Sequence, residues 1–287
     1  SDYIRNNIIS YVNSNTENTI EISDSRYNLK GELIISDILL SDINSDTIFK
    51  LESLSTKYIP LISNNQYYSS LKIEGLKIYL DKADKGIDQS LDENNLEQIF
   101  ENFFFDNIEI SNSHFIIKDD SIQNQLSINN SFIKEISQVQ NGVNFEIESF
   151  NGNFSNIKID DFNSIVNFEG DKLYLNNTYL ANENNFIDGD IIIDFDEDFQ
   201  IKNISTNSLN FKIEPSKFNI VQNNFLVDNI FSGQIEFSGS NKELTIDRFF
   251  LNNKFFELHA EINLMDVLSE DIEVNTVINN LKINEEF

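Results

Sequence analysis

The two histidines are the first residues in this chain that could do chemistry. His114 and His259 lie far apart in sequence, and each sits within a stretch where apolar and polar residues alternate. A catalytic dyad or a metal site requires side chains that converge in space, which two separate histidines of this kind do not indicate. We therefore interpret both as ordinary strand residues.

A run of carboxylates is the second candidate. Asp194, Asp196, Glu197 and Asp198 occur in the segment DFDEDF and could supply oxygen ligands for calcium. The glycine and the terminal glutamate of an EF-hand loop are missing. Charge runs usually face solvent, so we interpret this segment as a solvated turn and predict no metal site.

Enzyme signatures are otherwise absent from the sequence. It has no glycine-rich phosphate loop, no G-x-S-x-G and no nucleotide fingerprint. A carboxylate pair for glycoside hydrolysis stays open, because such a pair is defined by distance in space. However, the chain has no tryptophan to form a sugar-binding platform. We predict a protein that is not an enzyme and that uses no cofactor.

Charge and composition exclude several classes of partner. The 287 residues include 48 acidic and 20 basic ones, which gives a net charge of −28. Nucleic-acid binding depends on Lys and Arg neutralising phosphates, so we predict no nucleic-acid partner. Attraction to an anionic membrane surface is excluded for the same reason. There is no cysteine, and no apolar run reaches the ~18 residues of a membrane-spanning helix.

The dominant pattern is alternation between apolar and polar residues, which is typical of half-buried strands. In Ser70–Asp81, Leu71 and Ile73 share one parity, and Leu76, Ile78 and Leu80 share the other after Gly75. Such a change of parity predicts a β-bulge, and we expect others at Ser36-Asp37 and around Ser111–Ser113. The same alternation occurs in Asn28–Asp42, Asn107–Asp119, Gly142–Ile159, Asp171–Leu175, Asp188–Phe195, Asn207–Glu214, Gly233–Phe237, Lys242–Asp247, Glu257–Leu264 and Asp271–Ile278.

Helical spacing is confined to a few segments. The first is Asp2–Asn13, whose apolar stripe we expect to close one end of an apolar face as a plug. A second short helix is predicted over Asp92–Phe105, and Ser216–Asp228 is ambiguous. The plug residues are Ile4, Ile8, Ile9 and Val12.

The 25 phenylalanines and their aliphatic neighbours occupy the apolar parity of these strands. Such a face forms either the core of a sandwich or barrel, with two sheets about 10 Å apart, or a groove filled by lipid chains. Periodicity does not separate the two. We predict a groove lined by Leu71, Ile73, Leu76, Ile78, Leu80, Ile108, Ile110, Phe115, Phe145, Ile147, Phe154, Leu173, Leu175, Ile191, Ile193, Phe195, Leu209, Phe211, Ile213, Ile235, Phe237, Leu244 and Ile246.

Five segments carry a resemblance to a known family: Thr19–Ser23 (TIEIS), Leu29–Asp42 (LKGELIISDILLSD), Asp46–Leu54 (DTIFKLESL), Leu71–Leu80 (LKIEGLKIYL) and Asn94–Phe100 (NNLEQIF). The amphipathic helix precedes them, and weaker similarity continues through Phe145–Ile159 and Lys172–Phe195. In these segments the chain resembles the TamB/AsmA-like family, specifically the N-terminal periplasmic region of Bacteroidota TamB homologues.

The resemblance implies a periplasmic protein anchored in the inner membrane of a Gram-negative bacterium. Its long sheet would form an open trough that carries phospholipid toward the outer membrane, with an Omp85-class outer-membrane partner. The family's membrane helix, which precedes the position of Tyr3, and its C-terminal region are missing here. We therefore expect this chain to be a piece of a longer protein. The family contributes no catalytic residues.

We expect an all-β fold, namely an elongated, curved, mostly antiparallel sheet forming a half-open trough. Residues 1–18 would form the helical segment and residues 19–287 a continuous β-trough. The expected function is transfer of phospholipid along the groove. The alternatives are a scaffolding β module of an outer-membrane assembly machine, with a dry core, and an adhesin or glycan-binding solenoid. An adhesin should show exposed aromatic or calcium sites and a more regular repeat, and neither is evident.

Overall fold

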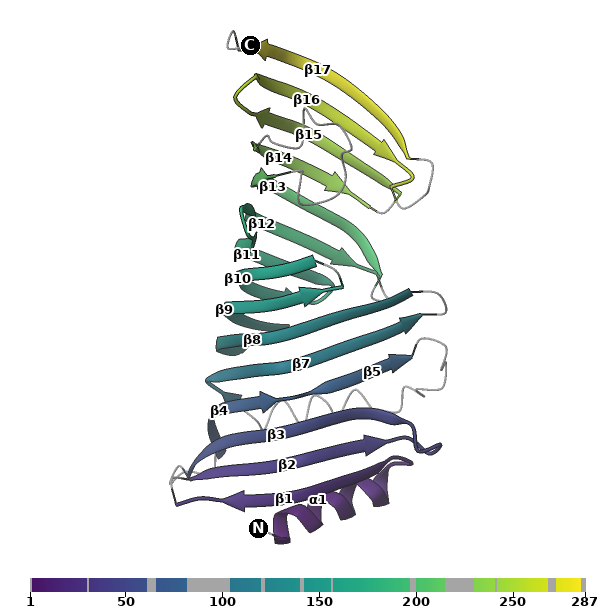
Figure 1. Ribbon diagram of the computed structural model, residues 1–287, viewed down its shortest axis with the longest axis vertical. Coiled ribbons are helices and arrows are strands. Elements are labelled where there is room, and N and C mark those ends of the chain that lie inside the picture. The colour runs from purple at the N-terminus through teal and green to yellow at the C-terminus, as the bar shows by residue number, and fades with distance from the viewer. Residues whose placement is uncertain are drawn as a thin grey trace. The chain divides into compact units, whose positions relative to one another are not determined.

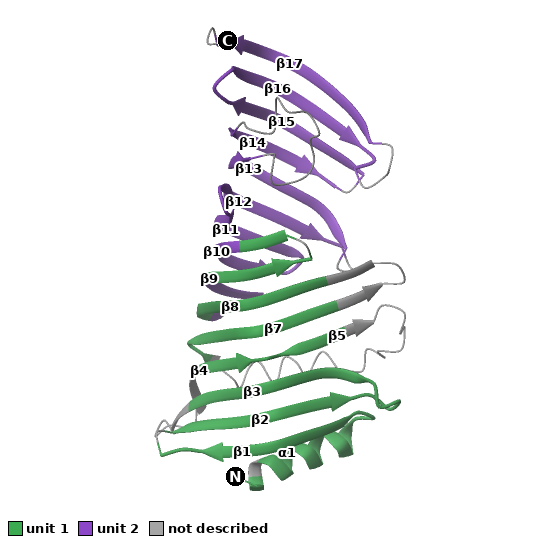
Figure 2. Cartoon of the chain, in the orientation of Figure 1, with its two compact units in different colours: residues 1–136, 148–159 green, residues 137–147, 160–287 purple. Residues whose placement is uncertain are grey.

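The chain folds almost entirely as β-strands. The computed structural model describes residues 2–29, 31–60, 66–81, 104–119, 122–139, 142–155, 157–196, 200–214, 230–240, 242–267 and 272–284. These residues form a single α-helix and seventeen strands (Figure 1). Two compact units make up the chain: residues 1–136 with 148–159, and residues 137–147 with 160–287 (Figure 2). The all-β, mostly antiparallel prediction is confirmed, whereas the trough shape stays a prediction.

Unit 1 begins with the helix α1 (Asp2–Asn15), which lies beside the first strand (Figure 1). In unit 1, β1–β2, β2–β3, β3–β4, β3–β5 and β7–β8 pair antiparallel, whereas β4 and β5 run parallel to β7, and β6 parallel to β4. Its strands are β1 (Thr19–Tyr27), β2 (Glu32–Ser41), β3 (Thr47–Pro60), β4 (Gln66–Glu74), β5 (Lys77–Asp81), β6 (Phe104–Phe105), β7 (Asn107–Asp119), most of β8 (Ile122–Val139) and the second half of β9 (Gly142–Phe154).

The structure describes the first of the two expected helices and only the end of the second. The first helix extends two residues beyond the expected end at Asn13. The second expected helix lies outside the described residues over 92–103 and stays a prediction there. Its expected end at Phe105 is wrong, because the backbone of Phe104–Phe105 pairs with β4 as strand β6. The ambiguous segment 216–228 also lies outside the described residues.

Unit 2 is an antiparallel meander in which each strand from β10 to β17 pairs with the next. Short turns connect most of these strands. Gly170, for example, takes a left-handed φ of 60° in the two-residue turn that joins β10 to β11. The strands are β10 (Ile157–Glu169), β11 (Lys172–Asn182), β12 (Asn185–Phe195), β13 (Ile201–Ile213), β14 (Phe231–Gly239), β15 (Glu243–Asn252), β16 (Phe256–Met265) and β17 (Glu273–Ile283).

The changes of parity predicted in unit 1 coincide with unusual backbone conformations. Asp37, Gly75 and Asn112 all have positive φ, at 53°, 68° and 50°. In β2, Ile35 and Ile38 are both buried although they have opposite parity, because the backbone at Asp37 turns the strand over between them. The pairing of β2 with β1 and β3 does not shift at Asp37, and the pairing of β7 with β8 does not shift at Asn112. No residue is inserted at either position, so the β-bulges predicted there are wrong.

In unit 2 the irregularities are true bulges, and they recur at one level. The pairing shifts between Leu175 and Thr178 of β11, between Thr206 and Leu209 of β13, and after Ile246 in β15. In each case the odd-numbered strand has one more residue than its even-numbered partner between the paired positions on either side of the shift. A bulge bends and twists its strand, so a row of bulges at one level bends the whole meander along that line.

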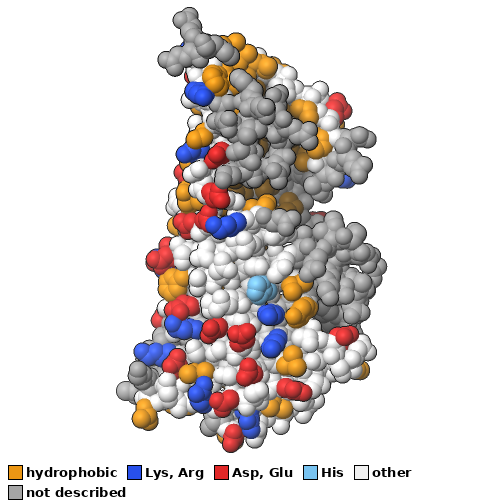
Figure 3. Space-filling view, in the orientation of Figure 1, with side chains coloured by type: hydrophobic (Ala, Val, Ile, Leu, Met, Phe, Trp, Pro, Cys, Tyr) orange, Lys and Arg blue, Asp and Glu red, His pale blue; other side chains and the backbone are white. Residues whose placement is uncertain are grey.

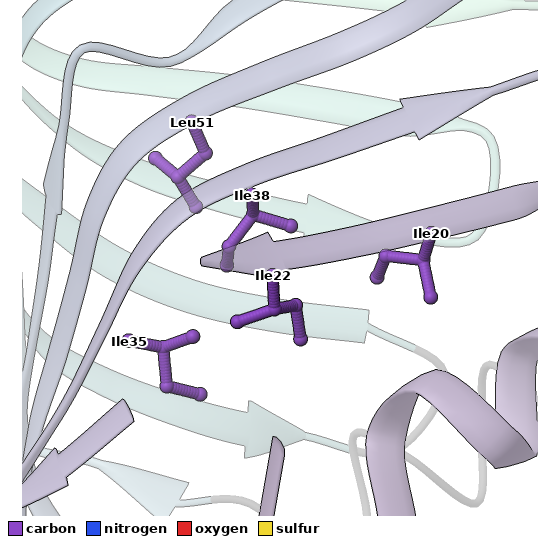
Figure 4. Close-up of a cluster of buried hydrophobic side chains, with 5 residues drawn as sticks. All are labelled: Ile20, Ile22, Ile35, Ile38 and Leu51. Atoms are coloured by element: carbon purple, nitrogen blue, oxygen red, sulfur yellow. The ribbon is translucent and has the colours of Figure 1, made fainter. Parts of the chain in front are cut away.

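Unit 1 has a compact apolar core next to α1. Ile20 and Ile22 of β1, Ile35 and Ile38 of β2, and Leu51 of β3 form a cluster of buried side chains (Figure 4). Ile8, Ile9 and Val12 of the helix pack against this cluster. The helical stripe seen in the sequence therefore faces the first three strands.

Candidate functional site: an apolar groove in unit 2

One face of the unit 2 sheet is built from directly paired apolar residues. Across β12 to β15, Ile187 pairs with Phe211, Phe211 with Gly233, and Gly233 with Leu251. Residues directly opposite each other in antiparallel strands project to the same face. The rows therefore run across the strands and define a continuous surface.

This apolar face contains no charged side chain among the described residues, in a chain of net charge −28. In each bulged strand the apolar residues change from odd to even positions, or the reverse, at the extra residue. The apolar side chains therefore stay on one face along the whole strand. The apolar face consists of Phe162, Ser164, Val166, Phe168, Leu173, Leu175, Thr178, Leu180, Ile187, Gly189, Ile191, Ile193, Phe195, Ile204, Thr206, Leu209, Phe211, Ile213, Phe231, Gly233, Ile235, Phe237, Gly239, Leu244, Ile246, Phe249, Leu251, Phe256, Leu258, Ala260, Ile262, Leu264, Val274, Thr276, Ile278, Leu281 and Ile283.

The opposite face of the same strands is charged and polar. Lys172 and Asp194 form an ion pair there at 3.2 Å, and the hydrogen bond to Asp194 raises the pKa of Lys172. Arg248 and Glu236 form another pair at 3.4 Å. Among the described residues, the charged side chains of this sheet therefore lie on one face only, and solvent is the expected environment of that face.

A groove of about 560 Å³ lies on the apolar face. This volume is within the range of about 300–1,000 Å³ that is typical of small-molecule sites. Every described lining residue is aliphatic or aromatic, so this part of the groove offers no side-chain hydrogen bond to an occupant. The lining residues are Ile187, Leu209, Phe211, Ile213, Phe231, Ile235, Phe249, Leu251 and Phe256.

Aromatic rings form much of the groove wall. Phe211 and Phe249 stack with their centroids 6.2 Å apart and their planes at 15°. Phe231 and Phe256 lie 6.2 Å apart at 52°. Gly233 stands between Phe211 and Leu251 in its row and has no side chain, which leaves room for the ring of Phe211.

Burial on the apolar face is greatest along the bend. Ser164, Thr178, Thr206 and Ala260 are only 2–3% exposed, whereas groove residues such as Phe211 are half-buried. Small residues therefore sit where the bent strands leave the least space, and large ones line the wider part. Ser164 Oγ and Thr178 Oγ1 are hydrogen-bonded at 2.8 Å. The Thr206 hydroxyl is buried without a partner.

The sequence-based groove residues of β11 to β15 fall on the apolar face. Four of them, Leu209, Phe211, Ile213 and Ile235, line the groove itself. The others on this face are Leu173, Leu175, Ile191, Ile193, Phe195, Phe237, Leu244 and Ile246. Phe145 and Ile147 of β9 are half-buried.

In unit 1 the predicted residues form two groups. Leu71 pairs with Ile108 and Ile73 with Ile110, so these four share one face. Ile78 pairs with Phe115 on the other side of the Gly75 irregularity, and Leu76 packs against the core cluster. Phe154 is 49% exposed. The side chains of Leu80 and Ile4 lie outside the described set.

Sequence reasoning missed five groove residues: Ile187, Phe231, Phe249, Leu251 and Phe256. The alternation expected over Lys242–Asp247 stops where β15 carries its extra residue, so Phe249 and Leu251 appear at the wrong parity. Ile187 lies one residue before an expected strand. Reading the alternation across the bulge would have recovered the two β15 residues.

The candidate chemical residues that the structure describes lie apart from one another. His114 Nδ1 lies 3.1 Å from Ser127 Oγ, and His259 Nε2 lies 3.3 Å from Glu257. Asp196 accepts a hydrogen bond from the backbone N–H of Gln200, which closes a turn. Glu197 and Asp198 lie outside the described residues. No group of three or more potential metal ligands occurs in the described part of the chain.

The helix α1 is tied to the outer edge of β1. Asn13 Oδ1 accepts a hydrogen bond from the Ile20 N–H at 2.9 Å, and Arg5 donates to the Ser23 carbonyl at 3.1 Å. Within the described ranges no helix has the length and apolar character needed to cross a membrane.

The chain matches no protein-family model and no curated protein.

Proposed function

We propose that this chain binds lipid acyl chains along the apolar face of unit 2 and transfers phospholipid between membranes. The observation that carries the proposal is the uncharged, half-buried apolar face with its groove of about 560 Å³. A surface of this kind needs an apolar cover, because monomeric proteins rarely expose contiguous apolar patches larger than a few hundred Å².

Lipid suits this face better than a polar ligand. The described lining residues of the groove are all aliphatic or aromatic, so against them a polar ligand would lose its hydrogen bonds to water without replacement. An acyl chain loses nothing of this kind and gains about 0.8 kcal/mol for each buried methylene. An apolar wall also lacks fixed hydrogen bonds that would hold a lipid at one position, which favours movement along the face.

The proposal extends to the cellular setting that the resemblance to the TamB/AsmA-like family implies. There the protein acts in the periplasm, is anchored in the inner membrane and passes phospholipid toward the outer membrane with an Omp85-class partner. The irregular strands of unit 1 and the bulged strands of unit 2 are consistent with the curved sheet that a trough requires.

The test is mass spectrometry of lipid extracted from protein purified without strong detergent, with a matched pair of variants. Ile193 and Ile192 are neighbours on β12, both are half-buried, and they project to opposite faces. Ile193→Asp places a carboxylate on the apolar face and should abolish lipid retention. Ile192→Asp places the same charge on the polar face and should retain lipid.

Absence of phospholipid from the wild-type protein, after exposure to vesicles, would contradict the proposal. Equal retention by the two variants would also contradict it. A folded, lipid-free protein would favour the alternative, a scaffolding β module of an outer-membrane assembly machine whose apolar face is covered by protein.

A further inference from the structure

The apolar face of unit 2 carries very few polar side chains. In the space-filling view, hydrophobic side chains gather where β16 and β17 lie (Figure 3). Among the described residues of the apolar face, the side chains with a polar atom are Ser164, Thr178, Thr206 and Thr276. Thr276 is exposed to solvent, so the buried hydroxyl groups of this face are the other three.

Thr206 differs from the other two buried hydroxyls because it lacks a hydrogen-bond partner. Ser164 and Thr178 are 2% and 3% exposed, and their hydroxyls bond each other at 2.8 Å. Thr206 is just as deeply buried, at 3%, but its Oγ1 atom is unpaired. A buried water needs two to four polar partners, and the neighbouring side chains of the face, Leu209 and Phe237, offer none. An unpaired buried hydroxyl destabilises a fold, so its presence calls for an explanation.

The position of Thr206 relative to the groove supplies one. Its next neighbour along β13 on the apolar face is Leu209, with the bulge of this strand between them. Leu209, Phe211 and Ile213 then follow each other along β13 as lining residues. The groove therefore begins beside Thr206 and runs away from the bend. Phe237 is the direct partner of Thr206 on β14 and is half-buried.

We propose that the hydroxyl of Thr206 donates a hydrogen bond to the ester carbonyl of a phospholipid whose acyl chain lies in the groove. The inference rests on the proposed function and adds to it a position where the lipid pauses. An ester carbonyl accepts but cannot donate, and it adjoins the end of an acyl chain. On leaving water it loses its hydrogen bonds, and the threonine hydroxyl is a donor without an acceptor. Pairing them satisfies both groups, once the ring of Phe237 has moved aside.

A single hydrogen bond at this position is compatible with transfer. The lining residues beyond Leu209 offer no further hydrogen bond, so the lipid is held at one point and can leave again. The unpaired hydroxyl of the empty protein then has a function, because the group that destabilises the fold without lipid is the donor in the lipid complex. Thr206→Val should therefore weaken recognition of the ester although it removes an unsatisfied group.

The test uses vesicles that contain a diester and a diether phosphatidylcholine with the same chains. The diether lacks the ester carbonyls and keeps the head group and the apolar chains. Each purified variant is incubated with an equal mixture of the two, and the retained lipids are quantified by mass spectrometry. The ratio of diester to diether on the wild-type protein should exceed the ratio on Thr206→Val about fivefold, which is the effect of one net hydrogen bond. Comparing the two ratios cancels any difference between the lipids in the vesicle.

Two further variants serve as controls. Thr206→Ser keeps the hydroxyl and should keep the wild-type ratio. Thr178→Val removes a hydroxyl of the same bend that is already paired, and should keep the wild-type ratio as well. Equal ratios for the wild type and Thr206→Val, or an equal fall in Thr178→Val, would overturn this inference while leaving lipid binding in place. Retention of neither lipid by the wild type would contradict the proposed function, and the inference with it.

Discussion

The ring of Phe211 lies across Gly233 on the neighbouring strand. The two residues are direct partners in the β13–β14 pairing, and a Cβ atom built on Gly233 would stand only 2.7 Å from Phe211 Cζ. The ring thus occupies the space that any other residue at position 233 would fill. From there it stacks on Phe249, which joins three strands of the groove wall through one side chain.

Gly233→Ala should therefore destabilise unit 2. The new methyl group would meet the Phe250 carbonyl oxygen as well as the Phe211 ring, and backbone cannot move aside as a flexible side chain can. Overpacking of this kind costs about 1–3 kcal/mol, measurable as a lower midpoint in urea unfolding. The neighbouring Ser232→Ala, at an exposed position, should change stability by less than about 0.5 kcal/mol. Equal effects would show that the close approach is unimportant.

Thr206→Val should raise stability. The Thr206 side chain is 3% exposed and its hydroxyl has no hydrogen-bond partner, which costs about 1–3 kcal/mol in a buried site. Valine has nearly the same shape and suits a strand. The matched change Thr178→Val should lower stability by about 1 kcal/mol, because it removes the shorter of the two hydrogen bonds of the Ser164 hydroxyl. Thermal unfolding of both variants compares the two; a loss of stability in Thr206→Val would contradict this account of the bend.

Asp37 provides a test of the backbone irregularity in unit 1. Its φ of 53° is tolerated by aspartate and glycine but costs roughly 1–2 kcal/mol in other residues. Asp37→Val should therefore destabilise unit 1 by about that amount, whereas Asp37→Gly should have little effect. The neighbouring Ser36 has no positive φ, so Ser36→Val adds the same side chain without this cost and serves as the control in denaturant unfolding. Similar losses for Asp37→Val and Ser36→Val would show that the left-handed conformation is not the cause.

The helix α1 should stabilise unit 1 through one face only. Replacing Ile8 and Ile9 together by alanine removes half-buried contacts with the core cluster and should cost about 2 kcal/mol. Tyr3 and Tyr11 are 76% and 70% exposed, so their replacement by alanine should change stability by less than about 0.5 kcal/mol each. Urea unfolding followed by circular dichroism measures both. A larger loss from the tyrosine variants would place the contact face of the helix elsewhere.

The sequence predicted some of the groove residues and missed others, and the difference has a physical cause. Alternation identified Leu209, Phe211 and Ile235 as members of one face, since strand periodicity depends only on local geometry. It failed at Phe249 and Leu251, because a bulge inverts parity and no residue type marks an inserted position. The parallel pairing of β4 with β7 was equally invisible, because it depends on which strands meet in space rather than on local pattern.

Glycine and aspartate marked some of the irregularities in unit 1. Gly75 and Asp37 are residue types that tolerate positive φ, so a change of parity beside them indicated a turn of the backbone. In unit 2 the groove depends on Gly233 for a different reason, namely the missing side chain beneath Phe211. That role arises from a cross-strand contact, which a single strand pattern does not contain.

The central claim is that acyl chains lie against the apolar face, and photocrosslinking from two adjacent positions of β13 measures this most directly. Phe211 lines the groove, and Asn210 is exposed on the opposite face of the same strand. With a photoreactive amino acid at position 211, we expect phospholipid adducts from living cells, and none with the same amino acid at position 210. A folded protein that yields no lipid adduct at position 211, or equal adducts at both positions, would contradict the claim.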